Sequence, residues 1–246
     1  MMIQTMLGFI LSTTIVLLAY YKESLSISGG VAAIMVGTLI YAFGGPYLFS
    51  VLIIFFAASA LIGSLRTNPA PANRNALQVL SNALFATVFA ILYFIDGAQM
   101  YLILYFVTIG VSASDTFSSE LGRLSKKEPR HLFTRKTMAN GLSGAVSPLG
   151  FLGAFLGATL FASLAIPFIR DPQIIILIGI AAFSGSLIDS ALGTIQVKFL
   201  DKESGAIVES PGSNTTHHSG VRLLGNSGVN FIANAMIVVI LYLYFL

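Results

Sequence analysis

Long apolar runs separated by short polar connections dominate the chain. A membrane-spanning helix needs about 20 mostly apolar residues, and the runs predict eight such helices. Their approximate bounds are 3–21, 27–43, 46–65, 75–95, 99–118, 141–168, 174–197 and 226–246. The run 27–43 is short and begins at Gly29 and Gly30, so a re-entrant or tilted segment stays open there, with a seven-helix bundle as the alternative. We expect an all-α polytopic membrane helix bundle, with residues 1–246 forming a single transmembrane domain.

Composition agrees with this class. Hydrophobic residues make up 56% of the chain and charged residues only 9%, whereas about 25% of an ordinary soluble domain is charged. The mean hydropathy is +0.87. The absence of cysteine excludes disulfides and thiolate chemistry. The first apolar run lacks a basic segment before it and a small-residue cleavage site, so we interpret it as a retained helix and not as a signal peptide.

The basic residues lie almost entirely in alternate connections. The connections 22–26, 66–74, 119–140 and 198–225 hold 12 of the 13 Lys and Arg, and the opposite set holds only Arg170. Cytoplasmic loops carry the excess of Lys and Arg. The basic side is therefore predicted to be cytoplasmic, with both termini outside, in a bacterial or archaeal cytoplasmic membrane or an organelle membrane.

Three further patterns bear on organisation. The stretch 201–220 is polar and predicts a mobile loop or an excursion containing β-turns. Ser112-x-x-Asp115-Thr116-x-x-Ser119 resembles Ser186-x-x-Asp189-Ser190-x-x-Gly193, which suggests a short internal pseudo-repeat. Gly153-x-x-x-Gly157 is typical of close packing between membrane helices.

Polar residues recur at helical spacing on four of the predicted helices. Residues three, four and seven apart share a helix face, and each such stripe must face protein or water inside a membrane. The stripes are Arg74, Gln78 and Asn82; Ser112, Asp115 and Ser119; Ser186, Asp189, Gly193 and Gln196; and Asn226, Asn230 and Asn234. All four fall in the predicted cytoplasmic half, level with the segment Asn140–Ser147. They predict one polar cavity open to the cytosol.

Acidic and basic groups meet at this level. Asp115, Glu120 and Asp189 supply carboxylates, and the loop from Arg123 to Lys136, which includes Lys126, supplies cations. Mg²⁺ takes one or two carboxylates plus phosphate oxygens, and Lys or Arg neutralises the remaining phosphate charge. The glycine-rich segment around Ser143 predicts an anion site at a helix N-terminus. Glu120 lies about 140° round the helix from Asp115, so both can bind one metal only if the helix unwinds there.

Five ordered motifs resemble a known family. They are Arg74-x-x-x-Gln78-Val79-Leu80-x-Asn82, Ser114-Asp115-Thr116-x-x-Ser119-Glu120-x-Gly122, Asn140-Gly141-x-Ser143-Gly144-x-Val146-Ser147, Gly185-Ser186-x-x-Asp189-Ser190-x-Leu192-Gly193-x-x-x-Gln196 and Asn226-x-x-Val229-Asn230. From about residue 20 onward the chain is similar to the integral membrane family catalogued as domain of unknown function 92. Its members include the plant phytyl phosphate kinase and eukaryotic transmembrane protein 19.

The resemblance implies a kinase that converts a prenyl monophosphate, such as phytyl phosphate, to the diphosphate. It implies Mg²⁺ held by Asp115, Glu120 and Asp189. It also implies a nucleoside triphosphate as co-substrate, with CTP as the first candidate. Ser119 would join these acids at the catalytic centre. The residues expected to bind substrate or nucleotide are Arg74, Gln78, Asn82, Arg123, Lys126, Asn140, Ser143, Ser186, Gln196, Asn226 and Asn230. Two positions depart from the expected pattern: Ser227 stands where an Asp is expected, and Met138-Ala139 where Gly-Thr is expected.

Two other functions stay open. The same stripes would suit a transporter or flippase of a phosphorylated lipid or small anion, although such a protein should also carry polar groups in the outer half of the membrane. A cytidylyltransferase that forms a CDP-lipid is the third reading. The expected partners are the lipid bilayer, an isoprenoid phosphate and a nucleotide. No nucleic-acid partner is expected, and the oligomeric state is not readable.

Overall fold

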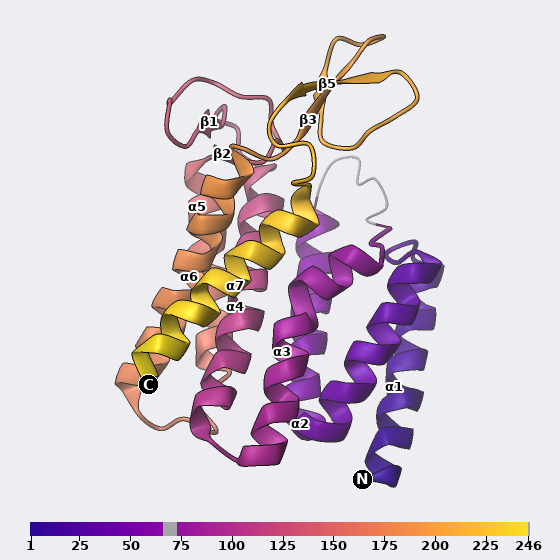
Figure 1. Ribbon diagram of the computed structural model, residues 1–246, viewed down its shortest axis with the longest axis vertical. Helices are drawn as coiled ribbons and strands as arrows, with labels where there is room; N and C mark the ends of the chain where they lie inside the picture. The colour runs from indigo at the N-terminus through magenta and orange to yellow at the C-terminus, as the bar shows by residue number, and fades with distance from the viewer. Residues whose placement is uncertain (66–72, 246) are drawn as a thin grey trace.

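The computed structural model describes residues 1–65 and 73–245 of the chain. The predicted basic connection at 66–74 therefore lies mostly outside the described residues, Arg66 included. Within the described residues the fold is mainly helical (Figure 1). The helices are α1 (Met2–Tyr21), α2 (Ile27–Gly63), α3 (Ala76–Asp96), α4 (Gln99–Gly122), α5 (Pro148–Ser163), α6 (Pro172–Gly193) and α7 (Asn226–Phe245). Six of them are long and apolar enough to cross a membrane, and α5 is a shorter apolar helix.

Helix α2 is two helical segments joined at a kink. Gly45 has non-helical dihedral angles, φ 75° and ψ −178°, and Pro46 follows it. The rings of Tyr41 and Phe49 are 5.4 Å apart, whereas eight residues of straight helix would separate them by about 12 Å. The chain thus turns back on itself here. The two runs predicted at 27–43 and 46–65 are two helical segments, and the described residues hold eight segments in all.

The sixth predicted helix is shorter than expected. Residues 141–147 are not helical, and α5 begins at Pro148, with the Ser147 hydroxyl accepting a hydrogen bond from the Gly150 N–H at 3.1 Å. Gly141 and Gly144 have φ of 90° and 81°, values that a helix does not allow. The expected helix N-terminus is therefore a turned loop, which we call the glycine loop (139–147).

The short strands all lie at the end of the bundle opposite the two termini (Figure 1). β1 (Arg130–His131) pairs with β2 (Ala145–Val146). β3 (Lys198–Asp201), β4 (Ile207–Val208) and β5 (Thr215–Ser219) form an antiparallel sheet in the order β4-β3-β5. The stretch 201–220, predicted as a mobile loop or a turn-containing excursion, holds the end of β3 together with β4 and β5, and turns join these short strands. We call this side, with loops 22–26, 123–147 and 194–225, the basic end.

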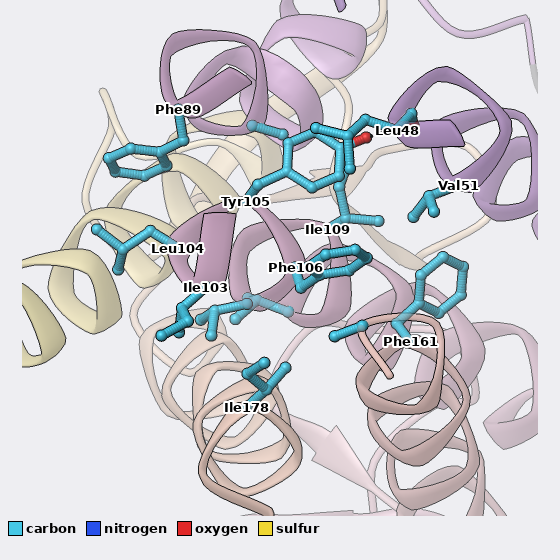
Figure 2. Packing of buried hydrophobic residues seen from close by; sticks show 14 of the residues in the cluster. Leu48, Val51, Phe89, Ile103, Leu104, Tyr105, Phe106, Ile109, Phe161 and Ile178 are labelled. Atoms are coloured by element: carbon cyan, nitrogen blue, oxygen red, sulfur yellow. Dashed lines mark hydrogen bonds between the residues drawn. The ribbon is translucent and has the colours of Figure 1, made fainter. Parts of the chain in front are cut away.

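Helix α4 is the centre of the packing. It contacts α2, α3, α5, α6 and α7, and Tyr105, Phe106 and Ile109 on it are fully buried. Figure 2 shows Phe106 in one buried cluster with Phe161 of α5 and Ile178 of α6. The Tyr105 hydroxyl donates to the Leu48 carbonyl oxygen at 2.6 Å, so the one polar atom of this side chain is satisfied in the core.

The small-residue motif on α5 brings that helix close to α4. A Cβ built at Gly153 would lie 2.5 Å from the Phe117 carbonyl oxygen, and one at Gly157 would lie 2.9 Å from Ser114 Cα. Ser114 Oγ donates to the Ala154 carbonyl oxygen at 2.8 Å. The prediction of close packing at Gly153-x-x-x-Gly157 is confirmed. It fixes the part of α4 that carries Asp115.

Candidate functional site

A cavity of about 1640 Å³ lies toward the basic end, larger than the roughly 300–1,000 Å³ of most ligand pockets. Its lining residues fall into two groups. The polar branch, as we call the first group, comes from α4, α6, the start of α7 and the glycine loop. The apolar branch, the second group, comes from α1 and both segments of α2, and includes Ile15, Val16, Ala33, Phe49, Leu52 and Phe56. The cavity therefore suits an amphipathic ligand.

Asp115 of α4 and Asp189 of α6 form the acidic centre of the polar branch. Their carboxyl groups lie close enough to interact directly. Asp189 is 8% exposed. Two carboxylates brought this close in a membrane protein are costly unless a proton or a cation neutralises them.

Amides from two other helices surround the acidic pair. In the orientation that satisfies both of its polar atoms, the Asn230 amide donates to Asp189 Oδ2 at 2.9 Å and to the Asn226 carbonyl oxygen at 3.0 Å. The side-chain amides of Asn230 and Asn82 lie 3.5 Å apart. Ser112 Oγ donates to the Asn82 carbonyl oxygen at 2.9 Å. The four predicted polar stripes, on α3, α4, α6 and α7, thus meet in one place.

Most residues predicted for the site line this cavity. They are Arg74, Gln78, Asn82, Asp115, Ser119, Glu120, Arg123, Asn140, Ser143, Ser186, Asp189, Asn226 and Asn230. Two do not. Lys126 is exposed in the loop after α4, and Gln196 is fully buried just after α6, outside the lining of the cavity. The helical stripe of Gln196 fails because α6 ends at Gly193.

Several lining residues also hold the local structure. Gln78 forms a capping box with Asn75 at the start of α3, and its carbonyl oxygen accepts from Asn82 Nδ2 at 2.8 Å. The Arg74 carbonyl oxygen accepts from the Ser26 N–H at 3.0 Å, which ties the start of α3 to the start of α2. Asn140 Nδ2 donates to the Arg123 carbonyl oxygen at 2.9 Å. These bonds position the wall of the cavity.

Glu120 does not join the acidic pair. Helix α4 continues without unwinding to Gly122, so Glu120 faces another direction, and a Cβ at Gly63 would lie 3.5 Å from its carboxylate. Among the described residues, no three Asp, Glu, His or Cys side chains converge to hold one metal ion. The structure therefore brings together two members of the predicted acidic triad, Asp115 and Asp189, and places the third near the end of α2.

Glu209 is a site residue that the sequence reasoning missed. It directly follows β4, and its carboxylate accepts hydrogen bonds from the Ser143 N–H at 2.5 Å and from Ser143 Oγ at 3.0 Å. Its charge is felt by Asp189 and by Lys198. It was overlooked because 201–220 reads as a polar surface loop. The signal in the sequence was the apolar pair Ile207-Val208 followed directly by the acid Glu209, inside an otherwise polar stretch.

Lys198 is the second missed residue. It is 6% exposed, and its Nζ donates to the Gly193 carbonyl oxygen at 3.1 Å, at the end of α6. Burial lowers the pKa of its ammonium group, and the nearby Glu209 carboxylate acts in the opposite direction. Lys198 is thus a buried cation within electrostatic range of Glu209, although it is not among the described residues that line the cavity. Lys198 had been counted only for topology.

These features define an integral membrane protein with an amphipathic cavity and an acidic centre. The family model for integral membrane protein DUF92 matches residues 10–238. The chain belongs to this family, as the five motifs suggested.

Two relatives are informative. Protein PGR of Arabidopsis thaliana is 31% identical over 259 aligned positions, which cover 91% of this chain and 90% of the relative. Uncharacterized membrane protein MJ0933 of Methanocaldococcus jannaschii is 34% identical over 170 positions, 67% of this chain and 71% of the relative. No solved structure matches.

Proposed function

We propose that this protein is a membrane-embedded phosphotransferase that converts a prenyl monophosphate, such as phytyl phosphate, to the diphosphate, with CTP or another nucleoside triphosphate as donor. The observation that carries the proposal is that one cavity is lined both by an acidic polar set of residues and by an apolar set. A prenyl phosphate has the same two parts. Its phosphate would lie near Asp115 and Asp189, and its chain along α1 and α2.

The residues of the acidic centre fit Mg²⁺. Asp115 and Asp189 would hold the ion, with its other positions left to phosphate oxygens and water, as is usual for magnesium in nucleotide enzymes. When bound, Mg²⁺ would supply charge neutralisation across the reacting phosphates. Glu120 is no longer part of this ligand set. Asn230, which donates to Asp189 Oδ2, would keep that carboxylate oriented.

The reaction needs little proton chemistry. A monophosphate oxygen of the prenyl substrate attacks the γ-phosphorus of the nucleotide; a new O–P bond forms, and the bond from that phosphorus to the β,γ-bridging oxygen breaks, leaving a nucleoside diphosphate. The attacking group is already anionic, so no general base is required. Catalysis rests on positioning and electrostatics. Arg123, which interacts electrostatically with Asp115, is the cation we assign to the transferring phosphate.

The proposal includes an orientation. The basic end would face the cytoplasm, with both termini outside, because the positively charged loops stay on the cytoplasmic side. The nucleotide would then enter from the cytosol between the glycine loop and the β3–β5 sheet. The prenyl phosphate would enter from the same leaflet. Both substrates would then reach the same cavity from the cytoplasmic side.

The test is turnover by purified protein with Mg²⁺, a panel of nucleoside triphosphates and prenyl phosphates of several lengths. We expect a prenyl diphosphate and a nucleoside diphosphate. Asp115→Asn and Asp189→Asn should each reduce kcat by about 100-fold or more, because a metal ligand is lost. Asp96→Asn, at an exposed position at the far end of α3, is the matched control and should be fully active.

Other outcomes point elsewhere. Release of pyrophosphate with a CDP-linked lipid would replace the kinase by a cytidylyltransferase. No product with any donor, together with movement of the prenyl phosphate across liposomes, would overturn the enzyme proposal in favour of transport. Equal activity of Asp189→Asn and the wild type would remove the acidic centre from the mechanism.

A further inference from the structure

The Glu209 carboxylate accepts hydrogen bonds from two donors of the glycine loop. The Ser143 N–H and Oγ each donate to a different oxygen of the Glu209 carboxylate. Both residues line the cavity, and Glu209 is half-buried there. A backbone N–H and a hydroxyl converging on two oxygens of one anion are the donors found around bound phosphates.

The donors are held rigidly. Gly144 has φ 81°, and a Cβ there would lie 2.8 Å from the Thr194 N atom, so the glycine loop is pressed against the end of α6. The Gly193 carbonyl at the same place accepts from Lys198 Nζ. The loop and the buried lysine are thus fixed on one support. An anion that enters needs no rearrangement of its binding groups.

Glu209 follows a short strand and lies near other acids. The strand, β4, has two residues and lies at the edge of the sheet, where it pairs with β3. Its carboxylate shares the cavity with Asp115 and Asp189, and like charges at this range repel one another. The Glu209 carboxylate is therefore easier to displace than the glycine loop that binds it.

We propose that the Ser143 N–H and hydroxyl bind a phosphoryl group of the substrates, that the buried Lys198 ammonium behind the glycine loop adds positive charge, and that the Glu209 carboxylate occupies this site until the phosphate displaces it. The inference rests on the proposed function for the identity of the natural ligand. The ligand class is a phosphate or pyrophosphate anion. The β3–β5 sheet then acts as a cover whose contact with the glycine loop is exchanged for contact with substrate.

Binding of inorganic pyrophosphate to the purified full chain tests this without turnover. A group that competes for a site weakens apparent affinity in proportion to its occupancy. We therefore expect Glu209→Ala and Glu209→Gln to bind pyrophosphate about 3- to 10-fold more tightly than the wild type. Lys198→Met and Ser143→Ala should bind more weakly. Glu203→Gln, an exposed acid in the same sheet region, is the control and should match the wild type.

The competing explanation is that Glu209 is a further metal ligand. Titrations with and without Mg²⁺ separate the two. If Glu209 is a metal ligand, Glu209→Ala should bind magnesium pyrophosphate more weakly than the wild type, and this result would overturn our proposal. Affinities equal to those of the wild type in both conditions would overturn it as well. Tighter binding in both conditions supports it.

A second measurement uses the wild-type chain, so it does not depend on a variant folding. Pyrophosphate should accelerate amide hydrogen exchange at Val208 and Glu209, because the carboxylate is displaced and β4 is released. Most ligands slow exchange near their site, so the sign is diagnostic. Slower exchange there would overturn the proposal. If anion binding behaves as expected but no prenyl diphosphate forms, the proposed function fails and this binding site stands. If prenyl diphosphate forms but Glu209→Ala binds pyrophosphate like the wild type, the proposed function stands and this binding site fails.

Discussion

Replacing Gly153 by alanine should destabilise the bundle through one contact. The new Cβ would lie 2.5 Å from the Phe117 carbonyl oxygen and 3.1 Å from Leu121 Cδ1. The first contact is with backbone, which cannot rotate away, so α5 and α4 must separate. Overpacking of this kind costs about 1–3 kcal/mol. Alanine's better helix propensity recovers part of it.

The matched control is Gly179→Ala in α6. A Cβ at Gly179 would lie 3.5 Å from Ala162 Cβ, an ordinary van der Waals contact. Both variants gain the same helix propensity, so their difference isolates the steric term. About 1–3 kcal/mol corresponds to a Tm lower by about 2–12 °C for a chain of this size.

Thermal unfolding in detergent, followed by circular dichroism because the chain has no Trp, measures the difference. Activity should fall as well, since Phe117 is two residues from Asp115 and a displacement near 1 Å can cost about 100-fold. Equal Tm values for Gly153→Ala and Gly179→Ala would refute the view that backbone contact between α4 and α5 positions the acidic centre.

Three further changes test other parts of the structure. The pKa of Lys198 is lower in the folded than in the unfolded chain, so below the folded-state pKa both states hold the proton. Between that pKa and 10.5 the unfolded chain binds more protons, so the free energy of unfolding rises with pH. Lys198→Met should flatten this rise in thermal melts at alkaline pH. The N–H groups of Ser204 and Glu203 lower the pKa of Asp201, so Asp201→Ala should speed exchange of those amides, a difference that vanishes as pH falls through the folded-state pKa and the wild-type carboxyl is protonated. Ala33→Phe should fill the apolar branch and weaken the binding of long prenyl phosphates by about tenfold relative to short ones, which corresponds to the loss of about two methylene contacts. Val31→Phe, on the exposed face of the same helix, is the control. An equal change in affinity at all chain lengths would contradict the assignment.

The sequence predicted the parts of the fold that follow from helical periodicity. The polar stripes led to a shared cavity because i, i+3 and i+4 spacing fixes a face, and a polar face inside a membrane must meet another. Asp115, Asp189 and Asn230 therefore converge as expected. The kink at Gly45 was also readable, since Pro46 follows a glycine between two apolar runs.

The remaining features depend on contacts between distant segments. The glycine loop looked like a helix start because its residues are small and apolar, yet positive φ at Gly141 and Gly144 turns it toward the end of α6. Glu209 reaches Ser143 across 66 residues of sequence, and no local spacing encodes that pairing. Glu120 was grouped with Asp115 by proximity in sequence, whereas the continuing helix sends it elsewhere.

The central position of α4 has a consequence for how the protein is made. Its apolar window is the least hydropathic of the six candidate spans and the most buried. An Asp at the centre of an isolated membrane helix costs about 3 kcal/mol, and Asp115, which lies nearer the end of α4, would cost part of this. Asp189, which it meets in the folded chain, and Asn230, which donates to Asp189, lie on helices that leave the ribosome later. We therefore expect α4 to enter the lipid poorly by itself and to settle only once α6 and α7 have been synthesised, which makes membrane integration of this chain a cooperative event of its C-terminal half.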